Sequence, residues 1–313
     1  MSRVLIVKPG YAPGLATEVT RRVSLTSVLR ATVLLNLFDG DEVTWVTSAE
    51  AVPLVKGARN VRHAIPYDAE ASLALSYQTF DRVVNLEPSW EFCALAHSVD
   101  ARLRRGFTLD GCGEHVVALP GAERALDMER APLGCPGEAR PPQQVLYEVM
   151  GKDWRGEPLV LGYCPNVPET FDVGLNRRAP GADDTRRWPM HAWDALETTL
   201  AERYTVRHEG HTRDVCDLID WIASCRIVVS GDDLGLMLAL ALGKRVVGLF
   251  GPTPAAQCHV YGRGIKITPP MKLNCIPCCR EECEFARSCI ECIRPETVAQ
   301  AVGVLDTASV LEN

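Results

Sequence analysis

The sequence predicts an α/β protein made of two doubly wound domains that face a cleft. Apolar runs of strand length alternate with segments of helical pattern in both halves of the 313-residue chain. This alternation is typical of βαβ units and parallel sheets. A stretch rich in proline and glycine at residues 131–142 separates the two halves. We therefore expect Rossmann-like domains at residues 1–142 and 143–313.

The first half holds three apolar runs suited to buried parallel strands, at residues 3–8, 41–47 and 81–86. Residues 24–37 predict a helix after the first strand. Residues 143–150, which follow the linker, predict a helix that bridges the two halves.

The second half repeats the pattern. Its expected strands are residues 159–162 or 173–176, then 204–208, 226–230 and 245–250. Its expected helices are residues 191–203, 212–224, 234–242 and 295–307. Pro295 suits the first turn of the last helix, because proline lacks the N–H that this turn leaves unpaired. Ligands of doubly wound domains bind at the carboxyl ends of the strands, so the residues that end each strand are the candidates for function.

The composition excludes several classes of function. A net charge of −7 gives no general attraction to nucleic acid or to anionic lipid. No apolar run reaches the length of a membrane span, and a strand rather than a signal peptide opens the chain. Thirteen cysteines without a secretion signal favour a reducing compartment. We expect a cytoplasmic protein without a nucleic-acid partner, and the sequence leaves homo- and hetero-oligomers open.

Cysteines concentrate near the end of the chain, where six of the thirteen lie between residues 275 and 292. A Cys-x-x-Cys step with further cysteines at short spacing is typical of a metal knuckle, and four thiolates close a tetrahedral site around zinc or iron. The alternative is a reduced cysteine-rich turn without metal. The predicted ligands of this cysteine finger (residues 275–292) are Cys275, Cys278, Cys283 and Cys289, with Cys279 and Cys292 as alternatives.

The run from Ile227 to Gly243 predicts a strand, a turn and a helix. The turn contains Asp232 and Asp233, and Gly235 follows them. Backbone N–H groups and the positive dipole end at the start of such a helix suit a phosphate group. The alternative is that one of the two aspartates is simply the N-cap of the helix.

A loop with four arginines follows the predicted strand that ends at Asn176. Arginine side chains suit bidentate contacts with phosphate groups. The alternative is a solvated run of charges. The arginines are Arg177, Arg178, Arg186 and Arg187.

Together these segments resemble glycosyltransferase family 9, the family of ADP-heptose:lipopolysaccharide heptosyltransferases. The resemblance covers almost the whole chain and is strongest over residues 228–298, which hold the Gly-Asp turn, the run 241–253 and the cysteine finger. Arg186 stands shortly before Trp188-Pro189, as the family's basic residue does. Some branches of the family carry a similar four-cysteine finger, with iron in part of them.

The resemblance implies a GT-B fold and the transfer of a sugar, heptose being one candidate, from a nucleotide-diphosphate donor. The acceptor is expected on the N-terminal domain and would be a glycan, a lipopolysaccharide or a protein. The finger would hold structural iron or zinc, and no catalytic metal is implied. The resemblance places donor binding at Asn176, Arg178, Arg186, Asp232, Asp233 and Gly235.

The departures from the family pattern fall on the chemistry. The general-base aspartate of the family aligns with Ser27, whose hydroxyl does not take a proton near neutral pH. Glu18 and Asp232 are the remaining candidates for the catalytic group. Asp233 would place a negative charge beside a phosphate, and Met237 replaces a histidine. These departures keep a second hypothesis open, a catalytically inactive GT-B relative that acts as a structural or partner-binding protein.

Overall fold

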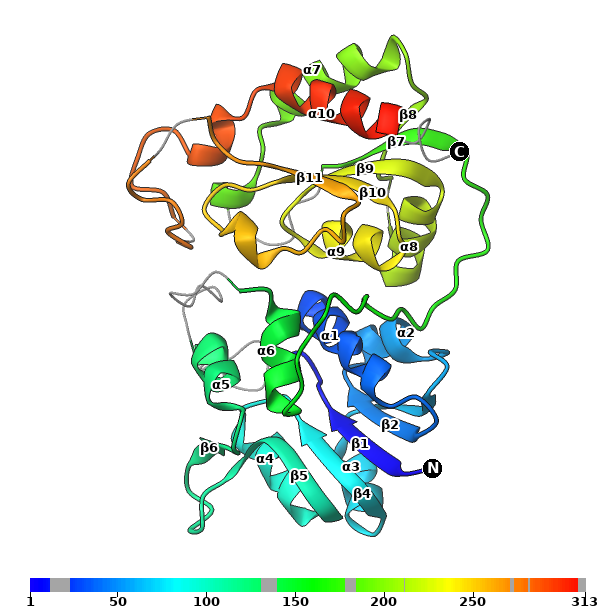
Figure 1. The fold of residues 1–313 in the computed structure, drawn as a ribbon, viewed down its shortest axis with the longest axis vertical. Coiled ribbons are helices and arrows are strands. Elements are labelled where there is room, and N and C mark those ends of the chain that lie inside the picture. The colour runs from blue at the N-terminus through cyan, green and yellow to red at the C-terminus, as the bar shows by residue number, and fades with distance from the viewer. Residues whose placement is uncertain are drawn as a thin grey trace. The chain divides into compact units, whose positions relative to one another are not determined.

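The computed structural model describes residues 1–11, 23–130, 140–177, 184–210, 212–270, 273–280 and 282–308. These residues form two units, each built around its own sheet (Figure 1). The first unit extends to Cys164, and the second continues from Pro165. The two α/β domains with mainly parallel sheets that the sequence predicts are thereby confirmed.

The sheet of the first unit has six strands in the order β3-β2-β1-β4-β5-β6. The first five are parallel, and β6 pairs antiparallel with β5. Central strand β1 is fully buried from Val4 onward, as its unbroken apolar sequence requires. The strands are β1 (Arg3–Val7), β2 (Glu42–Thr47), β3 (Val61–Pro66), β4 (Thr79–Asn85), β5 (Asp100–Leu109) and β6 (Val116–Ala118).

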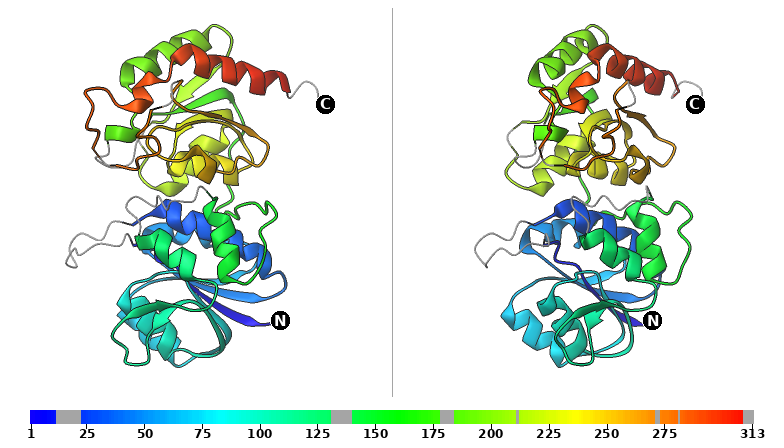
Figure 2. Two further views of the ribbon diagram at one scale, coloured as in Figure 1. Left: turned by 60° about the vertical axis from the view of Figure 1, so that its left-hand side comes forward. Right: turned by 90° about the vertical axis from the view of Figure 1, so that its left-hand side faces the viewer.

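Helices cover both faces of this sheet (Figure 2). On one face, Leu5 and Val7 of β1 share a buried cluster with Phe92 and Leu95. That face is covered by α3 (Ala69–Ser76) and α4 (Trp90–Ser98). The elements that pack with one another on the other face are α1 (Leu25–Ala31), the 3₁₀ helices η2 (Thr32–Leu37) and η3 (Ala49–Ala51), α2 (Val52–Val55), α5 (Glu123–Arg130) and α6 (Pro142–Val149). The helix predicted at residues 24–37 is thus α-helical only to Ala31.

The boundary between the units lies further along the chain than the predicted division after residue 142. Helix α6 packs against α1 and α5 of the first unit and buries Val145 and Tyr147 there. The extended segment after α6 stays on the same unit, because Val160 N donates to the hydroxyl of Thr32 at 3.1 Å. The predicted bridging helix therefore belongs to the core of the first unit.

The sheet of the second unit has five parallel strands in the order β11-β10-β9-β7-β8. Of the two alternatives for its first strand, residues 173–176 are right and residues 159–162 are not in a strand. The strands are β7 (Phe171–Asn176), β8 (Val206–His208), β9 (Cys225–Gly231), β10 (Arg245–Leu249) and β11 (Gly264–Ile267).

Two pairs of helices enclose this second sheet (Figure 1). α7 (Met190–Ala201) and α10 (Pro295–Ala308) lie on one face, where Leu196 and Val302 share a buried cluster with Val173 and Leu175 of β7. α8 (Val215–Ala223) and α9 (Leu234–Ala241) pack on each other and on β9. All four helices begin within three residues of their predicted positions.

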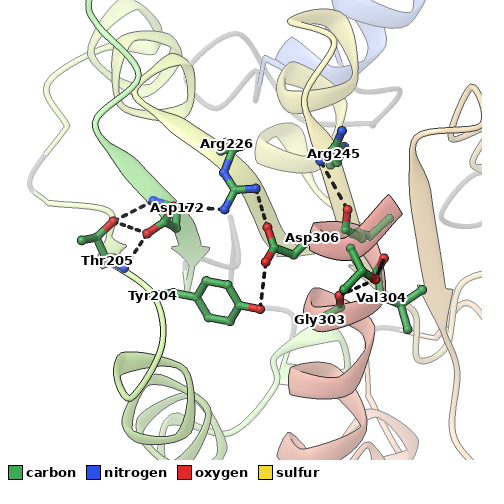
Figure 3. Close-up of polar contacts among 10 residues, drawn as sticks. Asp172, Tyr204, Thr205, Arg226, Arg245, Gly303, Val304 and Asp306 are labelled. Carbon is green, nitrogen blue, oxygen red and sulfur yellow. Dashed lines mark hydrogen bonds and ion pairs between the residues drawn. The ribbon is translucent and has the colours of Figure 1, made fainter. Parts of the chain in front are cut away.

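Arg226, at the amino end of β9, forms hydrogen bonds with both β7 and α10 (Figure 3). Its guanidinium donates to Asp172 of β7 at 3.0 Å and to Asp306 of α10 at 2.5 Å. The hydroxyl of Tyr204 donates to Asp306 at 3.4 Å. Asp172 also accepts from the hydroxyl and the backbone N–H of Thr205, and these bonds, supported by Arg226, lower the pKa of Asp172. This polar network fixes the amino edge of the sheet.

Candidate functional site at the strand-order reversal

The topology of the second unit singles out one position on the carboxyl edge of its sheet. β8 is added outside β7, whereas β9, β10 and β11 follow in turn on the other side, so the strand order reverses between β7 and β9. Ligands of doubly wound sheets bind at such a reversal. β7 ends here with Asn176, and β9 ends with Ser230 and Gly231, before Asp232 and Asp233. Several residues that the sequence singled out therefore meet at this reversal.

Asp233 is the N-cap of α9 and the centre of a buried polar cluster. Its carboxylate accepts from the backbone N–H of Leu236 at 3.1 Å and from the Ser230 hydroxyl at 2.8 Å. The amide of Asn176 donates to both Asp233 oxygens, at 3.0 and 2.9 Å, and to Ser230 Oγ at 2.8 Å. The Asn176–Ser230–Asp233 cluster thereby joins the ends of two strands to the first turn of a helix.

Burial raises the pKa of Asp233 to about 7. The hydrogen bonds from Ser230 and Leu236 act in the opposite direction, and the charge of Asp232 raises the pKa further. The carboxyl group that caps α9 can therefore gain or lose a proton near neutral pH.

This geometry shows what the Asp233 carboxylate contacts within the protein, while its place beside a phosphate stays a prediction. The carboxylate faces Asn176 and Ser230 and caps α9, so the N-cap alternative is confirmed. The carboxylate also occupies the N–H of Leu236 at the start of α9, which leaves that helix start less able to hold a phosphate. Asn176, expected to bind the donor, directs its amide N–H groups into the same cluster.

Gly235 is required by the close approach of Asn176. A Cβ at position 235 would lie 2.2 Å from Nδ2 of Asn176 and 2.8 Å from its Cγ, distances that no side chain tolerates. One half-turn further along α9, Met237 is buried among apolar residues. The residue that departs from the family's histidine thus contributes to the apolar core.

Asp232 differs from Asp233 in its surroundings. Its side chain is half-buried, and no donor among the described residues forms a hydrogen bond with its carboxylate. A carboxylate with open acceptor positions at the reversal of strand order can accept hydrogen bonds from the hydroxyl groups of a sugar.

Arg186 reaches the same edge from the 3₁₀ helix η5 (Asp184–Arg186). Its carbonyl oxygen lies 3.8 Å from the position that a Cβ of Gly231 would take, which puts η5 beside the end of β9. The side chain of Arg186 is half-buried. The structure therefore brings a guanidinium-bearing residue next to the turn that carries Asp232.

The other arginines of the loop are placed differently. The guanidinium of Arg177 contacts Asp194 at 3.1 Å and also binds Glu197, so it serves to hold α7. Arg187 is exposed. Arg178, a predicted donor ligand, lies outside the described residues. Of the four arginines, Arg186 is the one that the structure describes beside the end of β9.

The cysteine finger is anchored on the loop that follows β10. The backbone N–H groups of Cys278 and Cys279 both donate to the carbonyl oxygen of Pro252 at 3.1 Å. Cys289 is buried, and its Sγ lies 3.3 Å from the position of a Cβ on Gly251. Cys279, an alternative metal ligand, is disulfide-bonded. The finger is therefore packed onto the sheet at the β10 end.

Cys275, Cys278 and Cys283 affect the pKa of Cys289, the fourth predicted metal ligand. Burial, followed by the charges of Cys278, Cys275 and Cys283, raises the pKa of Cys289 to about 11. Among the described residues, no group of three or more His, Cys, Asp or Glu side chains is arranged to hold a metal ion. Four thiols in one short segment have the donor chemistry of a zinc or iron site, and the metal itself stays a prediction.

The predicted catalytic groups of the first unit are described only in part. Ser27 lies in the first turn of α1, where its backbone N–H donates to the side chain of the N-cap Ser24 at 3.3 Å. Glu18 lies outside the described residues. The catalytic roles of Ser27 and Glu18 stay predictions.

A buried ion cluster at the carboxyl ends of β1 and β4 was not predicted. Lys8 Nζ lies 3.4 Å from Glu87 and 3.2 Å from Glu129, and Glu87 accepts from the backbone N–H of Gly10 at 3.0 Å. Burial raises the pKa of Glu87, whereas the two glutamates raise that of Lys8 against the effect of burial. The sequence signal was a charged residue directly after each of two apolar strands.

Residues 212–288 match the model of glycosyltransferase family 9 (heptosyltransferase). The matched segment contains β9, the turn with Asp232 and Asp233, α9, β10 and most of the cysteine finger. Over this segment the chain is similar to glycosyltransferase family 9. A search of curated proteins by sequence found no significant match to it.

Solved heptosyltransferases have the same fold as this chain. E. coli ADP-heptose lps heptosyltransferase II matches with a TM-score of 0.66 at 14% identity, over 98% of this chain and 99% of that one. E. coli heptosyltransferase WaaC matches with a TM-score of 0.61 at 14% identity, over 96% and 99%. The iron-containing dodecameric glycosyltransferase TibC of enterotoxigenic E. coli matches with a TM-score of 0.62 at 10% identity, over 98% and 76%. The predicted GT-B fold is confirmed.

A helix that spans a membrane is long and apolar. Within the described ranges, no helix combines the necessary length with sufficient apolar character.

We predict that Gly235→Ala destabilises the protein by about 1–3 kcal/mol, because the added methyl group forces Asn176 out of the polar cluster. Gly303→Ala is the matched control, since Gly303 also lies in a helix and a Cβ there meets nothing within 4 Å. The control should be neutral or more stable by up to about 1 kcal/mol. Chemical denaturation measures both changes, and equal effects would contradict the packing argument.

We predict that the stability difference between wild type and Asp233→Asn depends on pH. The folded pKa of about 7 lies above the ordinary value of 3.8, so the folded protein binds the proton more tightly than the unfolded chain. Wild-type stability relative to the variant should be greatest below about pH 4 and should fall as the pH rises through about 7. Denaturation across this range tests the sign, and a difference that does not change with pH would contradict it.

Proposed function

We propose that this protein transfers a sugar from a nucleotide-diphosphate donor to a hydroxyl group of a glycan or other cell-envelope acceptor. The observation that carries the proposal is that the backbone of Arg186 lies beside Gly231, the residue before Asp232, at the end of β9, where the strand order reverses. A guanidinium suits the diphosphate, and an open carboxylate suits the hydroxyl groups of the sugar. The family match over residues 212–288 supports the same reaction class.

ADP-heptose is the donor that the related structures support. WaaC was solved with ADP-2-deoxy-2-fluoro heptose, and TibC in complex with ADP-D-beta-D-heptose. We propose a lipopolysaccharide, another glycan or a protein as the acceptor, and a cytoplasmic location for the reaction. TibC is dodecameric, which supports an oligomeric assembly for this chain as well.

Arg186 would carry most of the contact with the diphosphate. Asp233 already occupies a backbone N–H at the start of α9, so the helix start has less capacity for the leaving group. Negative charge grows on the diphosphate as its bond to the anomeric carbon breaks, and a guanidinium fixed beside it stabilises that charge. Asp232 would accept hydrogen bonds from the donor sugar and so orient the anomeric carbon for attack.

The acceptor hydroxyl must lose a proton when it attacks and inverts the anomeric carbon. Ser27 is unsuited to this task, because a serine hydroxyl does not hold a proton taken from an alcohol near neutral pH. We propose Glu18 as the general base, with Asp232 retained for the donor. The match to family 9 and the shared fold favour a working transferase over the inactive relative.

We also propose that the cysteine finger binds structural iron or zinc through Cys275, Cys278, Cys283 and Cys289. A closed site of four thiolates leaves no coordination position for a substrate, so the metal would stabilise the finger and take no part in transfer. The iron-containing TibC supports iron as the metal.

We predict that Arg186→Ala lowers the rate of sugar transfer roughly a hundredfold to a thousandfold, the cost of losing one donor that stabilises a developing charge. The neighbouring exposed Arg187→Ala is the matched control and should retain activity. Transfer from ADP-heptose to a lipopolysaccharide-core acceptor measures both rates. Equal activity of wild type and Arg186→Ala would remove Arg186 from the reaction.

We predict that purified protein contains about one iron or zinc per chain and that Cys278→Ser releases it, since a tetrahedral site needs all four thiolates. The variant should also melt at a lower temperature. Cys164→Ser, at an exposed free cysteine outside the finger, is the control and should keep the metal. Elemental analysis and thermal melting test both statements, and protein free of metal with unchanged melting would contradict them.

A further inference from the structure

We propose that Thr185 is a positioning residue that couples the cysteine finger to the donor site. Its side-chain hydroxyl donates to the backbone carbonyl of Arg280, inside the finger, at 2.8 Å. Thr185 directly precedes Arg186 in η5, so this bond fixes the backbone from which the guanidinium extends. The inference rests on the proposed role of Arg186 in holding the diphosphate.

The segment that carries Arg186 is attached to the finger region at a second point. The indole N–H of Trp188 donates to the carbonyl of Ile293, directly after the finger, at 3.1 Å. Trp188 is buried and packs edge-on against Trp193 of α7, with ring centroids 4.9 Å apart. Arg186 is therefore held between two hydrogen bonds, one residue before it and two residues after it.

The finger itself is a fixed support. Its backbone is hydrogen-bonded to Pro252, and a Cβ on Gly251 would lie only 2.8 Å from Cβ of Ile290, so the finger touches the β10 loop without a gap. The 3₁₀ helix η7 (Cys289–Cys292) packs against η5 and begins with a capping box between Ser288 and Glu291. A continuous set of contacts thus runs from the end of β10, through the finger, to Arg186.

The chemistry of the donor explains why such a support would matter. Binding a diphosphate orders both the side chain of an arginine and the backbone that carries it. When hydrogen bonds already hold that backbone, binding has to offset only the lost rotamer freedom of the side chain. A one-ångström displacement of a group that stabilises the leaving diphosphate also lowers the rate. The finger therefore acts on donor binding through the position of Arg186, at a distance from the sugar.

The test is the affinity for ADP, measured by calorimetry on the full chain. Thr185→Val keeps the shape of the side chain and removes the hydroxyl. We expect ADP affinity to fall roughly threefold to tenfold, the effect of one hydrogen bond, and Thr185→Ser to restore it. Thr199→Val is the matched control, because its hydroxyl also donates to a backbone carbonyl, that of Ala195 on α7, at 3.0 Å. The control should bind ADP as the wild type does.

A double-mutant cycle separates positioning from a general loss of stability. In an Arg186→Ala background, Thr185→Val should lower ADP affinity no further, because the group that it positions is gone. Equal losses in both backgrounds would overturn the inference, as would unchanged ADP affinity in Thr185→Val. If Thr185→Val does not fold, Trp188→Phe removes the second bond and keeps a ring, and its ADP affinity must then fall in the wild-type background and not in Arg186→Ala. Absence of ADP binding in the wild type would overturn the proposed function itself, and this inference with it.

Discussion

The hydrogen-bond cluster of Asn176, Ser230 and Asp233 determines the shape of the candidate site in the second unit. The Asp233 carboxylate, on a half-buried residue, needs donors, because removing a charged group from water without hydrogen bonds costs several kcal/mol. The parallel register of β7 and β9 places Asn176 opposite Ser230, so two donors stand at the strand ends where the cap of α9 requires them. The same contact means that any side chain at position 235 would displace Asn176. The hydrogen-bond cluster therefore links the register of β7 and β9, the start of α9 and the choice of residue at position 235.

The two edges of this sheet are stabilised by different means, and the difference leaves one edge available for function. At the amino edge, Arg226 pairs with two carboxylates, those of Asp172 on β7 and Asp306 on α10. At the carboxyl edge, Asn176, Ser230 and Asp233 form their hydrogen bonds with one another. These donors are not directed at Asp232, whose carboxylate keeps open acceptor positions beside the cluster. A ligand would therefore approach the carboxyl ends of the strands, where Asp232 is open, and not the amino ends, where the charges are paired.

The use of an aspartate as the N-cap changes how a diphosphate would be held. In many nucleotide sites the N–H groups at a helix start contact the phosphates directly. Here the Asp233 carboxylate takes the N–H of Leu236 for itself, and burial places its pKa near neutrality. In the proposed function the contact with the diphosphate would then depend on Arg186, and the Thr185 hydroxyl, which donates to the carbonyl of Arg280, would position Arg186. The residue at the N-cap would thereby link the cysteine finger to the proposed donor binding.

The sequence by itself determined the fold class, the central strands and most helices of the second unit, because unbroken apolar runs and capping residues are local signals. It did not reveal β5, in which charged residues such as Arg104 interrupt the apolar pattern, nor β11, a four-residue strand at the sheet edge. The sequence also selected Asp232, Asp233 and Arg186 as chemistry-bearing residues. Only the tertiary structure decided that Asp233 faces inward, since its partner Asn176 lies 57 residues earlier in the chain. The direction of a polar side chain depends on which distant donors surround it, and that information exists only once the strands are paired.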